Sequence, residues 1–331
     1  MGRRLSLGGE PLRVGAKKIK GPRLPRPPKG AWRKEYPFRS RYFELQGGGL
    51  LHYLDEGVGP PVLMVHGNPT WSFMYRALVK TLAPDYRCLV PDHLGLGLSS
   101  RPRSGEYGFR LADRINDLTA FMASLKLTEP VHVVVHDWGG PIGLGWAGAN
   151  PDLVASLIIF NTGLRLPSPD YAPPLVLGLF RNTGFLGQLL ANRFNLFLRG
   201  FTQVGSVRPM PPAVVEGFLA PYSLAFLRPA IGRFVKDIPL APNHPSFSAL
   251  NRVDQDFDRL AKTPTLLVWG LADFVFSPVF LADFKARRPK ASVLALPRAG
   301  HLLLEDEPVK IGATARQFLS QARRPGESEV L

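Results

Sequence analysis

A carboxylate stands between a predicted strand and a predicted helix in the segment from His136 to Pro141, which reads HDWGGP. Residues 131–136 are apolar and β-branched and predict a buried strand, and residues 139–147 begin a helix. A strand, a sharp turn and a helix make up the nucleophile elbow G-x-S-x-G, whose small residues leave the central side chain exposed. Asp137 occupies the serine position, although Val135 departs from the first glycine. The pattern predicts an aspartate nucleophile that forms an ester with its substrate.

Two later segments supply an acid and a base in the order expected after such a nucleophile. Asp273 follows the strand-like residues 265–269, and His301 follows the strand-like residues 292–296. The chain has seven histidines, and the other six lie in strand-like runs or in loops rich in glycine and proline. We therefore expect His301 to act as the base and Asp273 to orient it.

The sequence resembles the haloalkane dehalogenases of the α/β-hydrolase superfamily over roughly residues 36–320. The segments that carry the resemblance are Tyr36-Pro37-Phe38, residues 51–57 (LHYLDEG), residues 66–71 (HGNPTW), residues 92–99 (DHLGLGLS), the aspartate elbow and Gly300-His301. The match to the superfamily rests on all of these segments. The match to the dehalogenases rests mainly on Asn68 together with Trp138.

The resemblance implies a role for each of five residues. Asp137 would displace halide from carbon, His301 would activate the hydrolytic water, and Asp273 would orient His301. Asn68 and Trp138 would hold the leaving halide. It also implies the subgroup with an Asp-His-Asp triad and an Asn-Trp halide pair, because strand 156–160 is followed by no carboxylate before residue 170 and no tryptophan lies in the expected cap.

The chemistry of these residue types supports the same roles. An alkyl halide has no carbonyl to attack, so an ionised carboxylate in a dry pocket must displace the halide in line. The indole N–H of Trp138 and the amide N–H groups of Asn68 are donors suited to the departing anion. Water would then attack the Asp137 ester with His301 as general base, and backbone N–H groups after the nucleophile and near Gly67 would form the oxyanion hole.

The order of elements predicts the α/β class. Strand-like runs at residues 42–46, 50–55, 61–65, 87–91, 131–136, 156–160, 265–269 and 292–296 alternate with helical patterns from the third run onward. This order favours an eight-stranded, mostly parallel sheet with helices on both faces, as in the α/β-hydrolase fold. We expect core segments at residues 36–162 and 246–331, separated by an inserted helical cap at residues 163–245.

The expected cap is rich in phenylalanine. Its members are Phe180, Phe185, Phe194, Phe197, Phe201, Phe218, Phe226 and Phe234. Packing of the cap on the core accounts for any one of them, and together they predict an apolar roof over a pocket for a small hydrophobic halogenated substrate.

Most of the net charge of +15 lies at the start of the chain. Residues 1–41 hold thirteen Lys or Arg against two Glu, with four prolines within residues 22–28 and no apolar run. Residues 1–35 are expected to form a basic, flexible leader, either a solvated tail or an arm that adheres to anionic surfaces. We find neither a signal peptide nor a transmembrane segment, and a single cysteine, Cys88, allows no intrachain disulfide, so a cytoplasmic location is favoured.

Three other functions remain open. An epoxide hydrolase uses the same aspartate nucleophile with two cap tyrosines, for which Tyr171 and Tyr222 are available, although such enzymes usually carry Phe where Asn68 stands. A cofactor-free, light-emitting oxygenase and a non-catalytic ligand receptor on a hydrolase fold are the others. No metal-ligand spacing or phosphate-binding loop is present in the sequence, so we expect no cofactor, with water as co-substrate.

Overall fold

The computed structural model describes residues 19, 23–165, 178 and 193–322. Its centre is an eight-stranded sheet in the order β1-β2-β4-β3-β5-β6-β7-β8. The strands are β1 (Arg41–Glu44), β2 (Leu50–Glu56), β3 (Pro61–Val65), β4 (Arg87–Pro91), β5 (Val131–Val135), β6 (Val154–Phe160), β7 (Thr265–Gly270) and β8 (Ser292–Leu296). The pairings of β1 with β2 and of β2 with β4 are antiparallel, and the others are parallel. The predicted mostly parallel sheet is confirmed.

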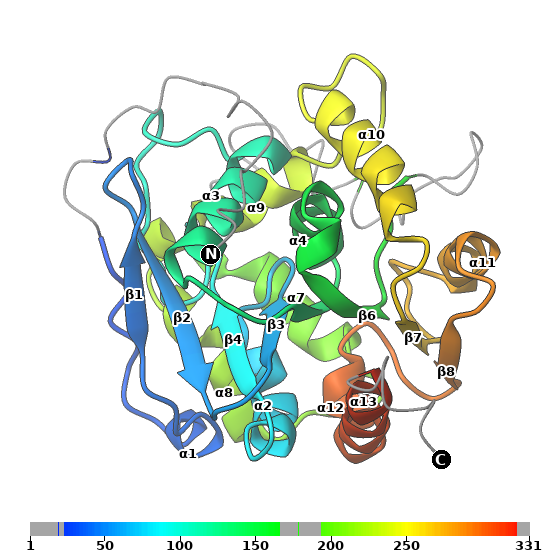
Figure 1. The fold of residues 1–331 in the computed structure, drawn as a ribbon. Helices are drawn as coiled ribbons and strands as arrows, with labels where there is room; N and C mark the ends of the chain where they lie inside the picture. Colours follow the sequence, from blue (N-terminus) through cyan, green and yellow to red (C-terminus); the bar gives the residue numbers. More distant parts are fainter. Residues whose placement is uncertain (1–18, 20–22, 166–177, 179–192, 323–331) are drawn as a thin grey trace.

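Helices cover both faces of this sheet (Figure 1). The α-helices of the described residues are α1 (Trp32–Glu35), α2 (Arg76–Leu82), α3 (Leu111–Ser124), α4 (Gly139–Ala149), α7 (Leu196–Val204), α8 (Pro212–Leu219), α9 (Pro229–Lys236), α10 (Phe247–Asp256), α11 (Pro278–Arg287), α12 (Leu303–Asp306) and α13 (Pro308–Ala322). α3, α4 and α10 pack together on one face, and α2 packs with α13 on the other. A sheet covered on both faces explains why its central strands are apolar throughout rather than alternating.

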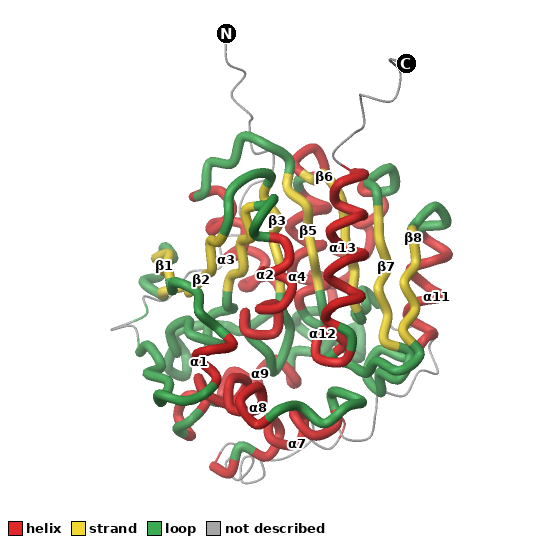
Figure 2. Tube along the Cα trace, turned by 90° about the horizontal axis from the view of Figure 1, so that it is seen from below, coloured by secondary structure: helices red, strands yellow, loops and turns green. Residues whose placement is uncertain are grey.

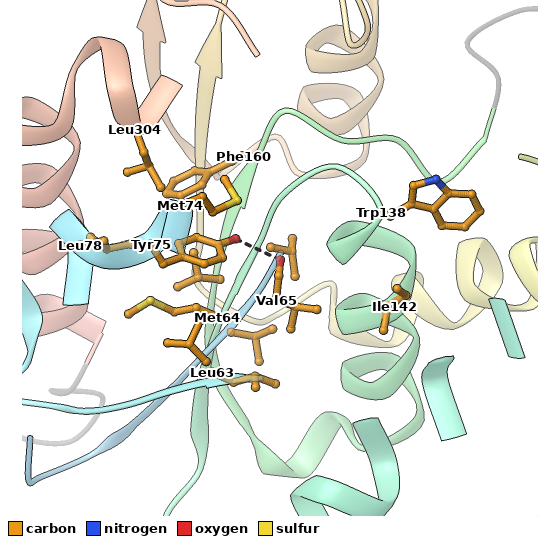
Figure 3. Close-up of a cluster of buried hydrophobic side chains, with 14 of the residues drawn as sticks. Leu63, Met64, Val65, Met74, Tyr75, Leu78, Trp138, Ile142, Phe160 and Leu304 are labelled. Atoms are coloured by element: carbon orange, nitrogen blue, oxygen red, sulfur yellow. Dashed lines mark hydrogen bonds between the residues drawn. The ribbon is translucent and has the colours of Figure 1, made fainter. Parts of the chain in front are cut away.

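The core is built around the central strands. All five residues of β3 and all five of β5 are buried. The Tyr75 hydroxyl, which is fully buried, donates a hydrogen bond to the carbonyl oxygen of Val65 at 3.0 Å, so its polar atom has a partner (Figure 3). Figure 3 also shows Trp138 at the start of α4 with its ring directed away from the side chains around Tyr75. The chain therefore runs from the buried core in β5 to the carboxyl end of the sheet at Trp138.

Within the described residues of the expected cap, three α-helices lie between β6 and α10 in the chain. α7, α8 and α9 lie together at one edge of the molecule, beyond the loops that follow the parallel strands (Figure 2). Of the phenylalanines predicted to form the roof, Phe201, Phe218 and Phe234 are buried, whereas Phe194 and Phe226 are exposed. Phe197 is partly buried, and two others, at 180 and 185, lie outside the described residues.

The folded structure begins earlier than residue 36, where the sequence placed the end of a flexible leader. Residues 32–35 form α1, and the Trp32 side chain is only 2% exposed. Its ring packs against Trp71 at 6.0 Å and against Tyr36 at 6.3 Å. The expectation of a flexible leader was therefore wrong for α1, because a large aromatic side chain binds this basic stretch to the core. The first eighteen residues lie outside the described part of the chain.

Within residues 19–322, as far as they are described, no single helix is long and apolar enough to span a membrane. Two helical segments, Pro212–Tyr222 and Ala225–Lys236, are long and apolar enough only when they are taken together, and the chain bends by 84° between them.

Candidate active site

The candidate nucleophile occupies a strained turn at the end of β5. Asp137 has φ of 52°, in the left-handed region that few non-glycine residues adopt. Gly139 permits this turn, because a Cβ there would lie 1.9 Å from the carbonyl oxygen of Val65. The predicted elbow is thus present in the fold, and Asp137 stands above the sheet at the carboxyl ends of the parallel strands.

Backbone N–H groups bind the Asp137 carboxylate. The N–H of Asn68 donates to Oδ1 at 2.7 Å, and the N–H of Trp138 also hydrogen bonds to this carboxylate. Gly67 must lack a side chain, since a Cβ there would lie 2.0 Å from Oδ1. Burial raises the pKa of Asp137, while His301 and these two N–H groups act in the opposite direction. The same donors are placed to stabilise an oxyanion on an Asp137 ester.

The predicted acid and base meet at the site. His301 Nδ1 lies 2.9 Å from Asp273 Oδ2, and His301 Nε2 lies 3.8 Å from Asp137 Oδ2. Asp273 is only 3% exposed, and its Oδ1 accepts the N–H of Val275 at 2.6 Å. Burial alone would lower the pKa of His301, but Asp273 and Asp137 beside it raise that pKa above the ordinary value. The arrangement orients the Nε2 side of the ring toward the nucleophile.

Aromatic rings enclose His301. Phe276 stacks on its imidazole at 5.9 Å, Phe201 of α7 meets it edge-on at 5.4 Å, and His136 lies at 4.6 Å. The Nε2–H of His136 donates to the carbonyl oxygen of His301 at 2.9 Å, which fixes the loop after β8. Burial keeps the pKa of His136 well below its usual value, so this histidine is neutral and supports the loop.

The two predicted anion donors flank the nucleophile. Asn68 is 8% exposed, and its amide Nδ2 donates to the carbonyl oxygen of Ile231 on α9 at 3.3 Å. An amide has two N–H bonds, so one donor remains for a leaving group. Trp138 is 9% exposed and meets Phe234 of α9 edge-to-face at 5.8 Å. Its indole N–H has no acceptor among the residues that the structure describes. All five predicted site residues therefore lie at one edge of the sheet.

A second buried network, which the sequence analysis did not predict, supports the loops of the site. Asp92 follows β4 and accepts His52 Nδ1 at 2.8 Å, the N–H of Ser72 at 2.7 Å and that of Leu98 at 2.8 Å. Burial alone would raise the pKa of Asp92, but His52, His66 and the N–H of Leu98 lower it to about 2. His66 Nε2 lies 3.6 Å from the same carboxylate. The network ties the loop after β3, which carries Asn68, to the loop after β4.

Tyr222, one of the two tyrosines available for an epoxide hydrolase, is hydrogen bonded to the loop after β4. The hydroxyl oxygen of Tyr222 accepts the N–H of Gly97 at 3.0 Å, and the Arg101 guanidinium lies over its ring at 5.4 Å. The other candidate tyrosine, at 171, lies outside the described residues. In the described part of the chain, no three His, Cys, Asp or Glu side chains are grouped to hold a metal ion.

The strand order, the elbow and the triad geometry define the α/β-hydrolase class. Residues 60–308 match the family model for the alpha/beta hydrolase fold, and the chain belongs to this family. This confirms the predicted fold class.

Relatives within the family carry two different activities in their names. The chain is 42% identical to a cis-3-alkyl-4-alkyloxetan-2-one decarboxylase of Shewanella oneidensis, over 86% of this chain and 89% of that protein. It is 34% identical to haloalkane dehalogenase 2 of Mycobacterium tuberculosis, over 84% and 94%. A crystal structure of a putative ancestral haloalkane dehalogenase superposes with a TM-score of 0.75 at 27% identity, covering 86% of this chain and 99% of that one. The resemblance to haloalkane dehalogenases is confirmed.

Proposed function

We propose that Asp137 attacks a saturated carbon of an apolar substrate and displaces an anionic leaving group toward Trp138 and Asn68. The observation that carries this proposal is a buried carboxylate on a strained elbow, oriented by two backbone N–H groups, beside two side chains with donors for an anion. A carboxylate removed from bulk water is a competent nucleophile toward carbon.

The substrate we favour is a 3,4-dialkylated oxetan-2-one, a four-membered β-lactone. Similarity at 42% identity to a decarboxylase of such rings supports this choice. Asp137 would attack ring carbon 4, and the bond from carbon 4 to the ring oxygen would break, which leaves a free carboxylate on carbon 3. That carboxylate would then leave as CO₂, its bonding electrons would form the alkene, and Asp137 would be expelled. The lactone becomes one CO₂ and one alkene, and no water is consumed.

This route predicts the geometry of the alkene product. Attack by Asp137 inverts carbon 4, and an anti elimination of CO₂ and the aspartate follows. The two steps together convert a cis ring into a cis alkene. Asn68 and Trp138 would bind the carboxylate that is released on ring opening, in place of a halide.

Hydrolysis of haloalkanes is the second candidate, and a specific observation favours it. The indole of Trp138 and the second amide N–H of Asn68 are donors that suit a halide, and relatives at 34% identity are named for this activity. Asp137 would form an alkyl ester with loss of halide, and His301 would activate water to release the alcohol and a proton.

One parallel assay tests both reactions. The full chain would be given a cis-3,4-dialkyl β-lactone, with alkene and CO₂ measured, and separately bromoalkanes, with halide and acid measured. Asp137→Ala should abolish whichever activity is found. Asp283→Ala is the matched control, because that carboxylate binds Arg165 on the side of α11. Turnover that survives in Asp137→Ala would contradict the proposal, and so would the absence of both products from the native chain.

A further inference from the structure

A buried arginine lies behind the tryptophan of the leaving-group site. Arg114, on α3, is 2% exposed. Its guanidinium carbon lies 3.5 Å from the centre of the Phe234 ring and 5.5 Å from that of the Trp138 ring. Because Phe234 also meets Trp138 edge-to-face, the cation and the two rings form one packed cluster.

The guanidinium of Arg114 is only partly hydrogen bonded. Nη1 of Arg114 donates to Asp237 Oδ2 at 3.1 Å. The other oxygen of Asp237 accepts Arg110 Nη1 at 3.1 Å and the hydroxyl of Ser246 at 2.7 Å. The remaining atoms of the fork, Nε and Nη2 of Arg114, are buried and have no hydrogen-bond partner among the described residues. One carboxylate thus binds two guanidinium groups, and the guanidinium of Arg114 is buried behind Trp138 with two of its three nitrogen atoms unpaired among the described residues.

Such an arrangement costs folding free energy, since a buried charge without full hydrogen bonding is destabilising. It has an electrostatic consequence at the site. A cation against the face of an indole withdraws electron density from the ring and makes its N–H a stronger donor. A fixed positive charge in a place without water also stabilises an anion that develops nearby. Both effects act in the same direction on a leaving group bound by Trp138.

The same contacts hold α9 in place. Phe234 and Ile231 belong to α9, and Asp237 ends it. Through these residues α9 touches Arg114, the Trp138 ring and the amide of Asn68. Arg114 therefore connects the helix that closes the site to both of its anion donors.

We propose that Arg114 is a positioning residue of the leaving-group site, which strengthens the Trp138 indole as an anion donor and fixes α9 against it. The inference rests on the proposed function, in which the leaving group reaches Trp138. It predicts that the contribution of Arg114 is largest for leaving groups of concentrated charge, such as chloride or the carboxylate of an opened lactone, and smallest for iodide.

Arg110 offers a matched control. It binds the same Asp237 carboxylate, but its side chain is 45% exposed, and among the described residues the guanidinium over the Trp138 ring is that of Arg114. Arg110→Met and Arg114→Met each remove one ion pair to Asp237, so loss of that ion pair by itself would change the ratio of kcat for a chloroalkane to kcat for an iodoalkane equally in both variants. The proposal requires them to differ.

The experiment compares native chain, Arg114→Met, Arg114→Lys and Arg110→Met on chloro-, bromo- and iodoalkanes of one chain length and on a cis-dialkyl β-lactone. Arg114→Met should lower kcat for the chloroalkane relative to the iodoalkane by roughly tenfold, which lies within the range of cation–π contacts, with little change in KM. Arg114→Lys should restore part of this ratio, and Arg110→Met should leave it unchanged. If Arg114→Met does not fold, Arg114→Met/Asp237→Asn removes the buried pair together and serves in its place.

Anion binding gives a readout that does not depend on turnover. Chloride affinity, measured by titration calorimetry, should be lost in Trp138→Phe and weakened about tenfold in Arg114→Met. If the native chain turns over no substrate but shows this pattern, the proposed function fails and the inference about Arg114 stands. Equal effects of the Arg114 and Arg110 variants, or chloride affinity that is independent of Arg114, would overturn it.

Discussion

Replacing His301 with Phe should separate the two candidate reactions. His301 is buried among Phe276, Phe201 and His136, so a phenyl ring of similar size fits the same enclosure. The variant lacks the Nε2 that lies 3.8 Å from the Asp137 carboxylate and therefore has no general base. It keeps Asp137 itself and the N–H groups that orient it.

The magnitude follows from the role of a base in ester hydrolysis. General-base catalysis contributes roughly 10²–10⁴ in rate, which is about 3–5 kcal/mol in the barrier. Alkylation by a bromoalkane does not use the base, so the ester on Asp137 should accumulate to one per chain while alcohol release slows by that factor. With the β-lactone no water is needed, and no stable adduct is expected.

Intact-protein mass spectrometry after exposure to each substrate is the assay, with peptide mapping to locate the alkyl group. Loss of His301 also leaves the Asp273 carboxylate without its imidazole partner, and the negative charge of Asp273 opposes ionisation of Asp137. The double variant His301→Phe/Asp273→Asn controls for this by removing that charge. Sustained alcohol release from a bromoalkane in either variant would refute the role of His301 as base. An ester that accumulates with the lactone would refute fragmentation without water.

Three further outcomes are expected. Haloalkane hydrolysis should decline as the pH falls through the raised pKa of His301, because protonation removes the base; the midpoint of a pH-rate profile should therefore lie above 6.5, and a midpoint below that value would contradict the geometry. Gly67→Ala would place a Cβ 2.0 Å from Asp137 Oδ1 and should cost about 10² in kcat by displacing the nucleophile, whereas Gly200→Ala, where nothing lies within 4 Å, should leave kcat unchanged. The pKa of Asp92 is lowered from 3.8 to about 2, so ionised Asp92 should contribute about 2 kcal/mol to the free energy of unfolding above about pH 4. This contribution should be lost as the pH falls toward the pKa of the folded state. In urea unfolding, the free energy of unfolding should therefore fall more steeply with decreasing pH for the native chain than for Asp92→Asn, and an equal dependence on pH would count against the network.

Much of the fold was readable in the sequence because its signals are local. Each predicted strand overlaps an observed one, since a buried strand in a covered sheet is a short apolar run between turn residues. Asp137 was found because the strand, turn and helix of the elbow lie within a few residues of one another. Asp273 and His301 were found because each follows a strand, and the carboxyl ends of parallel strands meet at one edge.

The substrate could not be settled at that level. The pair Asn68 and Trp138 indicates an anion that leaves carbon, and both a halide and the carboxylate of an opened lactone satisfy that description. The sequence pointed to the halide, and the similarity at 42% identity to an oxetan-2-one decarboxylase is the reason for proposing the lactone first.

Only the tertiary structure decided the roles of residues whose partners are far away in the chain. Arg114 lies in a helix with other charged residues, which predicts a solvated side chain, yet it is buried against Asp237, 123 positions later. Asp92 meets His52 across two strands, and Trp32 folds onto Trp71 although it follows a basic, proline-rich stretch. Hydrophobic periodicity and turn residues fix which segments form strands and helices. Burial and pairing of a single charge depend on which segments pack together, and that is set by the whole fold.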